Sequence, residues 1–327
     1  MNVVLLHTRD ALEPPEDPVL GQLEEAMRSG GHQVRRVEVD SAVEAAVQAL
    51  RSAPPDLVFN VAESFAGKSS LESNVAALLN LLGLRYTGSS PAGLILAGDK
   101  TLSKKMLGFH GIQTPKWASI FRGAVDTVQE LTFPVIVKPP QEDASIGVTS
   151  KSVVHDLGQL LERIGAVQTE FKQPVLVEQF IEGREFYVGV LGNADAEALP
   201  IVELDFTNFP TDRPRIASWE AKWGDDGAGA GAEFAGTRSV FPEALDDGLA
   251  ARIRKVAVDA FHALRLRDYG RIDLRVTDGG EIYVIEVNPN CYLERDSEFA
   301  RAAARAGLEY GALVARIIEL ASARYSR

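Results

Sequence analysis

The sequence predicts an α/β protein in which an N-terminal parallel-sheet domain is followed by a larger α+β region. The first ninety residues alternate between short apolar runs and amphipathic segments, as in a parallel sheet with helices on its faces. Near residue 280, two strand-like runs flank the turn Thr277-Asp278-Gly279-Gly280, which predicts an antiparallel hairpin. The chain has 327 residues, enough for two or three modest domains.

The N-terminal elements follow from hydrophobic periodicity. Strands are expected at residues 2–7, 33–39 and 56–60, and helices at 18–29, 43–51 and 72–82. No G-x-G-x-x-G follows the first strand, so a dinucleotide site is not indicated.

The remaining elements are predicted in the same way. Asp99 is expected to cap a helix at 98–109. Other helices are expected at 247–264, 298–306 and 310–322, and strands at 133–137, 175–181, 186–191, 271–276 and 281–288. The Gly- and Ala-rich run 225–236 predicts a mobile loop and is our candidate for an active-site lid.

Composition excludes several classes of function. The net charge of −12 disfavours nucleic acid as a partner. Cys291 is the single cysteine, which fits a reducing compartment, and we expect a cytoplasmic protein. No apolar run approaches the roughly 18 to 20 residues that span a bilayer, so we expect no membrane association.

The hairpin near residue 280 carries the most informative polar pattern. Side chains alternate along a strand, so Arg271, Asp273 and Arg275 are expected on one face. Glu286 and Asn288 on the return strand are expected to project with Arg271 and Asp273. A symmetric register would place Arg271 opposite Glu286 and Asp273 opposite Val284. The reverse face would be the apolar set Ile272, Leu274, Val276, Tyr283, Ile285 and Val287.

Carboxylate and amide oxygens are ligands that Mg²⁺ prefers, and an Arg beside them can hold a phosphoryl group. A solvated strand face with an ordinary Arg–Glu pair would explain the hairpin equally well. Lys138 at a strand end could reach a phosphate or could be a surface lysine. Glu178 and Glu185 flank a strand edge that could pair with adenine, or could form a plain charged turn.

Taken together, these segments resemble the ATP-grasp superfamily and, within it, the D-alanine–D-alanine ligase group. The resemblance covers nearly the whole chain and depends on motifs in the family's order. These are Tyr86-Thr87-Gly88-Ser89, Asp99-Lys100, Phe133 to Pro139, Val177-Glu178-Gln179-Phe180 with Glu185, Glu220-Ala221-Lys222, Gly270-Arg271-Ile272-Asp273 and Glu286-Val287-Asn288.

The resemblance implies a fold and a division of the chain. Residues 1–96 would form a Rossmann-like domain, 97–177 a central ATP-grasp subdomain, and 178–327 a C-terminal subdomain with the metal and substrate site. It implies an ATP-dependent carboxylate–amine ligase working through an acyl phosphate, and it favours a homodimer acting on small molecules.

The resemblance also assigns roles to single residues. Lys100, Lys138 and Lys222 correspond to lysines that hold ATP phosphates, with Ser145 in the phosphate loop. Glu178 and the backbone of Gln179, Phe180 and Ile181 correspond to the adenine contact, and Glu185 to the ribose contact. Asp273, Glu286 and Asn288 correspond to ligands of two Mg²⁺ ions, with Mn²⁺ as the alternative metal. Arg271, Lys222 and Ser145 would act on the reacting groups, and Ser297 would bind the second substrate's carboxylate.

The substrate pocket departs from the family pattern. Ala144 and Trp223 stand where the family has Ser and Tyr, and Tyr292 replaces a Gly that helps form the oxyanion hole. Glu63 and Arg295 would add charge near the substrate. We therefore expect an amino acid or peptide substrate other than two D-alanines.

Three alternatives stay open at this stage. The chain could be a D-alanine–D-alanine ligase with a divergent pocket or an ATP-binding protein without turnover. It could also be a carboxylating subunit that works with a biotin carrier. The full set of predicted metal ligands argues against the second, and the motif order argues against the third.

Overall fold

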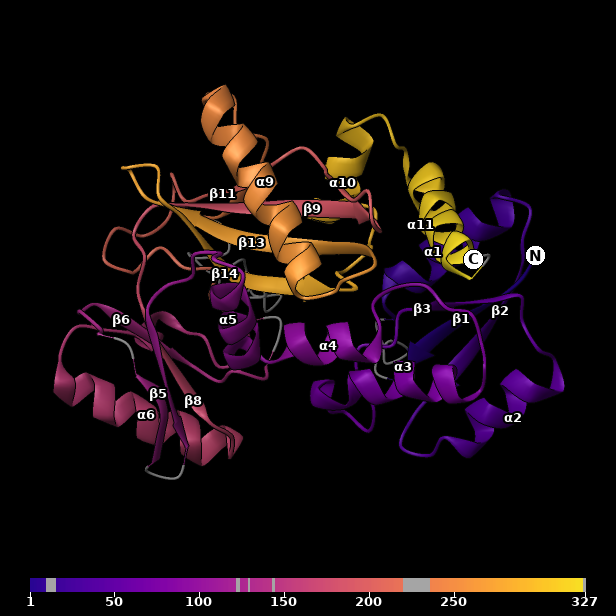
Figure 1. The fold of residues 1–327 in the computed structure, drawn as a ribbon, viewed down its shortest axis with the longest axis horizontal. Helices are drawn as coiled ribbons and strands as arrows, with labels where there is room; N and C mark the ends of the chain where they lie inside the picture. Colours follow the sequence, from indigo (N-terminus) through magenta and orange to yellow (C-terminus); the bar gives the residue numbers. More distant parts are fainter. Residues whose placement is uncertain (10–15, 122–123, 129, 143–144, 220–235, 326–327) are drawn as a thin grey trace.

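The computed structural model describes residues 1–9, 16–121, 124–128, 130–142, 145–219 and 236–325. Within these ranges the chain forms three sheets in succession, and Figure 1 shows them side by side, with sheet D between the other two. The α/β class and the order of a parallel sheet followed by antiparallel sheets are as predicted. None of the helices in the described residues is long and apolar enough to cross a membrane.

The first sheet, sheet A, is parallel and three-stranded, with order β2-β1-β3. Its elements are β1 (Asn2–Thr8), α1 (Pro18–Ser29), β2 (Gln33–Val39), α2 (Glu44–Ser52), β3 (Leu57–Asn60), the 3-10 turn η2 (Ser69–Leu71) and α3 (Glu72–Leu81). β1 and β3 are apolar runs buried between helices, as expected for parallel strands.

Two short helices lead from sheet A to the second sheet, where the sequence predicted one. α4 (Pro91–Gly98) is capped by Ser90, and α5 (Lys100–Phe109) begins immediately after it. Asp99 caps α5, as predicted, by accepting from Thr101 N at 2.8 Å and Leu102 N at 3.1 Å. The extended backbone of Asp99 separates the two helices. α5 therefore begins at Lys100, and the predicted start at residue 98 was too early.

The second sheet, sheet C, is antiparallel, with order β5-β4-β8-β6-β7. Its elements are β4 (Trp117–Phe121), β5 (Ala124–Val128), β6 (Val135–Lys138), the 3-10 turn η3 (Ser150–Ser152), β7 (Val153–Val154), α6 (Leu157–Phe171) and β8 (Val175–Gln179). β4, β5, β7 and α6 were not predicted from the sequence. The predicted domain boundary after residue 177 falls inside β8.

The third sheet, sheet D, has order β12-β11-β9-β13-β14, with β10 paired to β9. Its elements are β9 (Arg184–Gly192), β10 (Glu197–Ala198), β11 (Val202–Asp205), β12 (Arg238–Val240), α9 (Asp247–Ala263), β13 (Asp268–Val276), β14 (Ile282–Pro289), α10 (Glu298–Arg305) and α11 (Tyr310–Arg324). α9 lies across one face of this sheet (Figure 1) and packs its apolar side chains against β13 and β14. α10 and α11 cover part of the opposite face, and the rest of that face carries the polar residues of the β13–β14 hairpin.

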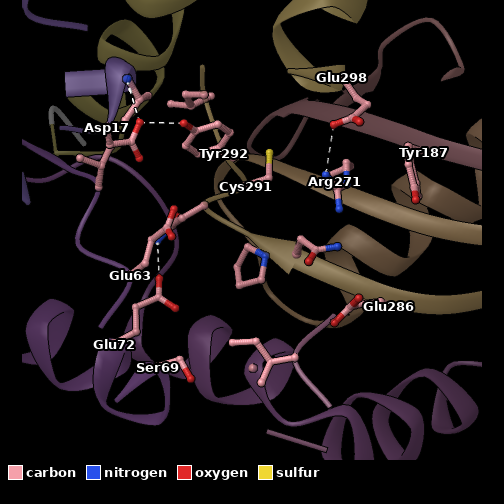
Figure 2. Close-up of a pocket in the computed structure, with 18 of the residues that line it drawn as sticks. Asp17, Glu63, Ser69, Glu72, Tyr187, Arg271, Glu286, Cys291, Tyr292 and Glu298 are labelled. Atoms are coloured by element: carbon pink, nitrogen blue, oxygen red, sulfur yellow. Dashed lines mark hydrogen bonds and ion pairs between the residues drawn. The ribbon is translucent and has the colours of Figure 1, made fainter. Parts of the chain in front are cut away.

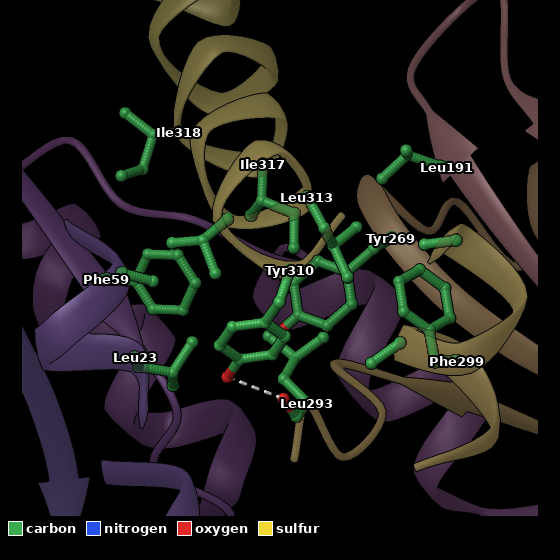
Figure 3. Packing of buried hydrophobic residues seen from close by; sticks show 14 of the residues in the cluster. Leu23, Phe59, Leu191, Tyr269, Leu293, Phe299, Tyr310, Leu313, Ile317 and Ile318 are labelled. Atoms are coloured by element: carbon green, nitrogen blue, oxygen red, sulfur yellow. Dashed lines mark hydrogen bonds between the residues drawn. The ribbon is translucent and has the colours of Figure 1, made fainter. Parts of the chain in front are cut away.

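The two ends of the chain share one hydrophobic core. α1 packs against α11, and residues of α1, β1 and β3 form a single buried cluster with residues of α10, α11 and sheet D. Figure 3 shows Leu23 and Phe59 of the N-terminal part facing Tyr310 and Ile317 of α11. Tyr310 also donates a hydrogen bond to the Leu293 carbonyl at 2.9 Å. The C-terminal helices therefore attach the parallel-sheet domain to sheet D.

Candidate active site

The β13–β14 hairpin brings the predicted polar residues together, but in a different register. Arg271 lies opposite Asn288 and Asp273 opposite Glu286, so the predicted pairs Arg271–Glu286 and Asp273–Val284 were wrong. A β-bulge between Asp273 and Leu274 adds one residue to β14 at this point. All four polar residues still share a face because each pair lies directly opposite across the ladder.

The bulge also changes which residues of β14 face the core. Ile282 and Val284 lie in the hydrophobic cluster with Ile272, Leu274 and Val276, whereas the prediction had placed them on the site face. Ile285, predicted for the core, lines the smaller of two cavities described below. One extra residue reverses the alternation of every residue beyond it, and the symmetric register did not allow for that.

Arg271 is held at the centre of the polar face by carboxylates. Its Nε lies 2.8 Å from Asp273 Oδ1, its Nη2 lies 3.0 Å from Asp273 Oδ2, and its Nη1 lies 3.6 Å from Glu298 Oε2. The guanidinium stacks 4.8 Å from the centroid of the Tyr187 ring. Burial opposes its charge, but Asp273 and Glu298 outweigh burial and raise the pKa of Arg271 further. Arg271 is therefore a permanent cation with a fixed direction.

Lys100 connects the hairpin to α5. Its Nζ lies 2.6 Å from Glu286 Oε1 and donates to the Glu142 carbonyl at 2.6 Å. Asn288 Nδ2 is buried and has no hydrogen-bond partner among the described residues. Since a buried amide without a partner is costly, this atom marks a place where a bound group would be expected.

A smaller cavity of about 90 Å³ lies between sheet C and the site face of sheet D. We call it the nucleotide cavity because it gathers most of the residues predicted to hold ATP. Its lining includes Lys100, Lys138, Ser145, Glu178, Gln179, Phe180, Ile181, Glu185, Asp273 and Glu286.

Glu178 lies at the inner wall of the nucleotide cavity and is almost fully buried. One carboxylate oxygen pairs with Lys138 Nζ at 2.5 Å, and the other pairs with Lys104. Burial opposes ionisation of Glu178, but the two lysines outweigh it and lower its pKa. In this arrangement the Glu178 side chain binds lysines, and the strand edge from Gln179 to Ile181 lines the cavity.

Glu185 is also committed to a cation. It accepts from Arg275 Nη2 at 2.6 Å and from Tyr187 Oη at 3.0 Å. Arg275 also donates to the Ile181 carbonyl at 2.9 Å and lies 5.1 Å from the Phe180 ring centroid. Ser145, with φ +64°, donates its hydroxyl to the Ala217 carbonyl at 2.7 Å.

A larger cavity of about 860 Å³ opens between the parallel-sheet domain and sheet D. We call it the substrate cavity, and Figure 2 shows Arg271 and Glu286 on one side of it with Asp17, Glu63 and Tyr292 on the other. Tyr292 donates a hydrogen bond from its hydroxyl to Asp17 Oδ1 at 2.7 Å. This contact joins the segment after β14 to the N-cap residue of α1.

Two of the four predicted substrate residues lie elsewhere. Ser297 caps α10 by accepting from Ala300 N, and its neighbour Glu298 lines the cavity instead. Arg295 stacks 5.1 Å from the Tyr310 ring centroid and pairs with Glu25 at 3.5 Å, outside the cavity lining. Lys222 and all but the last residue of the predicted lid lie outside the described residues.

The Tyr86-Thr87-Gly88-Ser89 segment binds residues at the start of β13 and just after β14. Gly88 N donates to Asp268 Oδ2 at 2.8 Å, and Ser89 N donates to Asn290 Oδ1 at 2.8 Å. Arg324 pairs with Asp268 at 2.7 Å. This segment therefore locks the ends of β13 and β14 to the parallel-sheet domain.

Comparison with known proteins decides the family. The family model described as D-ala D-ala ligase C-terminus matches residues 105–319, more than half of the chain. The chain belongs to the D-alanine–D-alanine ligase family. It is therefore an ATP-grasp protein and an ATP-dependent ligase that forms C–N bonds.

Relatives of this ligase cover most of its length. A protein of Sinorhizobium fredii is 33% identical over 320 residues, 95% of this chain and 89% of the relative. The D-alanine–D-alanine ligase of Pelobacter propionicus is 35% identical over 257 residues, 77% of this chain and 75% of the relative. The crystal structure of the Bacillus anthracis D-alanine–D-alanine ligase with ATP matches in fold, with TM-score 0.74, 24% identity and coverage of 99% and 98%.

Several residues of the ligase site escaped the sequence analysis. Lys104 lies one helical turn after Lys100, so the (i, i+4) spacing in α5 could have indicated that both face the site. Arg275 was expected on the same face as Arg271 and Asp273, but its pairing with Glu185 was not predicted. No local signal marks Asp17, since only tertiary packing brings the start of α1 to Tyr292.

Proposed function

We propose that this ligase joins a carboxylate to an amine through an acyl phosphate, and that its substrates are not two D-alanines. We further propose that at least one substrate carries an ammonium group beyond the reacting amine. The observation that carries the proposal is the lining of the substrate cavity, which is acidic and includes the bulky aromatic side chain of Tyr292.

The charge of the cavity supports a cationic substrate. Among the described residues that line it, six are acidic and two are basic. The acidic residues are Asp17, Glu63, Glu72, Glu142, Glu286 and Glu298, and the basic residues are Arg238 and Arg271. Arg271 pairs with Asp273 and Glu298, and Glu286 pairs with Lys100, so the acidic excess rests on Asp17, Glu63, Glu72 and Glu142 against Arg238. A cavity with this excess of carboxylates favours ligands of positive charge.

Tyr292 supports a change of substrate shape. It lies where the resemblance leads one to expect a glycine, and its hydroxyl reaches Asp17 across the cavity. A phenol ring at this point takes up volume that a glycine would leave open. Burial and the bond to Asp17 raise the pKa of Tyr292, so it stays a neutral hydrogen-bond donor.

ATP and its metal would occupy the nucleotide cavity and the adjoining hairpin. Lys100, Lys138 and Lys222 would hold the phosphates, while the edge from Gln179 to Ile181 and Glu185 would hold adenosine. The oxygens of Asp273, Glu286 and Asn288 fit Mg²⁺ or Mn²⁺ because they are hard ligands on one face. The unpartnered Nδ2 of Asn288 is a hydrogen-bond donor and would suit an acceptor such as a phosphate oxygen. When bound, two ions would neutralise charge on the phosphates.

The proposed chemistry proceeds in two steps. A substrate carboxylate oxygen attacks the γ-phosphorus of ATP, ADP leaves and an acyl phosphate forms. The amine nitrogen then attacks the acyl carbon, inorganic phosphate leaves, and one proton is lost. Arg271 is placed to stabilise charge on the acyl phosphate and on the tetrahedral intermediate, because its guanidinium is permanently charged and lies on the wall between the hairpin and the substrate cavity.

A D-alanine–D-alanine ligase with a divergent pocket is the second candidate. It is favoured by the names of relatives such as those of Desulfotalea psychrophila and Marinomonas, which are 31% and 32% identical.

The test is phosphate release from Mg·ATP against single and paired substrates, with products identified by mass. The panel should contain D-alanine, neutral L- and D-amino acids, diamino acids, diamines and short peptides. We expect release with a pair that includes a diamino compound and little with D-alanine alone. Efficient D-alanyl-D-alanine synthesis would overturn the substrate proposal in favour of the second candidate. ATP binding without release from any pair would favour a protein without turnover.

A matched pair of variants tests the cavity argument. Glu63→Gln removes one negative charge from the cavity lining, whereas Glu25→Gln removes one from the exposed surface near Arg295. We expect only the first to raise KM for the cationic substrate. Equal effects of the two variants would contradict a role for cavity charge.

A further inference from the structure

Three buried charged groups form a chain behind the nucleotide cavity. Lys104 on α5, Glu178 on β8 and Lys138 at the end of β6 have side chains that are 2%, 2% and 7% exposed. Glu178 lies between the two lysines, with one oxygen directed to each ammonium group. Lys104 is not among the residues that line the cavity, whereas Glu178 and Lys138 are.

We propose that Lys104 is a positioning residue for the ATP phosphates, which acts through Glu178 on Lys138. By sharing the carboxylate, Lys104 leaves the ammonium of Lys138 only partly compensated and directed into the cavity. This inference rests on the proposed role of Lys138 in holding ATP.

Charge balance gives the physical reason. Two ammonium groups around one carboxylate leave an excess of one positive charge in a site removed from water. Such an excess is costly in the free protein and is offset when an anion arrives. A one-to-one pair of Lys138 with Glu178 would have no such excess, and the lysine would have to leave its partner to bind a phosphate.

Neighbouring groups do not already supply this excess. Lys100, one turn before Lys104, is matched by Glu286 at 2.6 Å, and Arg275 is matched by Glu185 at 2.6 Å. Of the ion pairs described around the nucleotide cavity, the Lys104–Glu178–Lys138 cluster is the one with more cations than anions. Burial lowers the pKa of Lys104, Glu178 opposes that effect, and the charge of Lys138 adds to it, so the pKa lies below its ordinary value.

The experiment measures binding of Mg·ATP and of adenosine to the full chain by calorimetry, without acyl or amine substrate. Lys104→Met keeps the length of the side chain and removes its charge. We expect about tenfold weaker ATP binding, because one charge is lost near the phosphates. Adenosine binding should stay unchanged, since adenosine carries no phosphate. Lys105→Met, one residue further along α5 and exposed, is the matched control and should bind both ligands as the native chain does.

A double variant separates charge from structure. Lys104→Met with Glu178→Gln leaves Lys138 alone, with the same net charge as the native cluster, so ATP affinity should recover relative to Lys104→Met. If Lys104→Met does not fold, Lys104→Gln is read in the same way. Equal losses for ATP and adenosine, or no recovery in the double variant, would show a merely structural role and overturn the proposal.

Failure of the Lys104 inference gives a different result from failure of the proposed ligase function. Equal ATP affinity of native protein and Lys104→Met would overturn this inference and leave the ligase proposal standing. Native protein that binds no Mg·ATP would overturn both.

Discussion

Gly88→Ala perturbs the contact between the parallel-sheet domain and the end of β14. Gly88 has φ +88°, and a Cβ built there would lie 2.3 Å from Asn290 Oδ1. The same oxygen accepts the hydrogen bond from Ser89 N. An added methyl group must therefore displace Asn290, which lies two residues beyond the predicted metal ligand Asn288.

The magnitude follows from two contributions. A left-handed conformation costs a residue with a Cβ about 1–2 kcal/mol. Forcing a methyl group into a close-packed contact costs about 1–3 kcal/mol more. We therefore expect Gly88→Ala to lower the free energy of unfolding by about 2–5 kcal/mol and to slow phosphate release, because the displacement is transmitted to the end of β14.

Gly31→Ala is the matched control. Gly31 has φ +80°, but a Cβ there would have no heavy atom within 4 Å. It should lose about 1–2 kcal/mol from conformational strain alone and keep native turnover. Both variants are compared with the native chain by urea unfolding and by phosphate release. If Gly88→Ala destabilises the chain no more than Gly31→Ala, the argument from the Asn290 contact is wrong.

Three further predictions concern single side chains. Asp273→Asn and Glu286→Gln should each reduce ATP-dependent phosphate release by about 100-fold or more. Each also removes a partner of a buried cation, Arg271 or Lys100, so the unfolding temperature should fall, and turnover is compared where both variants are still folded. Native-like turnover in either would remove that residue from the metal site. Burial raises the pKa of the Cys291 thiol, so iodoacetamide should label it slowly in the native chain and quickly in urea, as followed by mass; rapid native labelling would contradict its burial. Burial opposes ionisation of Glu178, but Lys104 and Lys138 outweigh it and hold its pKa below the ordinary 4.5. Its contribution to stability is therefore complete above pH 4.5 and is lost as the pH falls through the lower folded-state value. Urea unfolding from pH 7 to pH 3 should show a shallower acid dependence for Glu178→Gln than for the native chain, and identical slopes would refute this.

The sequence by itself determined the fold class and most of the elements with strong periodicity. Residues 18–29 and 33–39 form the predicted helix and strand with the predicted bounds, and Asp99 caps α5 as expected. Apolar period and capping chemistry are local properties, so they can be read without knowledge of the packing. The order of the motifs along the chain can also be read without knowledge of the packing, and it was enough to indicate the family.

The weakly patterned part of sheet C could not be predicted in the same way. β4 and β5 are five residues each, and β4 is stabilised by pairing with β8, which is distant in the sequence. Their local pattern alone therefore does not distinguish them from loops. α6 was missed although its signal is local, because Asp156 caps it and Leu160, Ile164, Val167 and Phe171 recur at helical spacing on its packed side.

Tertiary structure alone decided how the site is assembled. The β-bulge in β14 set Asp273 opposite Glu286, and no turn signature indicates a bulge within a strand. Glu178 became the partner of two lysines only because α5, β6 and β8 meet there. The substrate cavity exists because α11 binds the parallel-sheet domain to sheet D and brings Asp17 to Tyr292. Which charges face one another across a cavity depends on contacts between distant segments, and local sequence does not encode those contacts residue by residue.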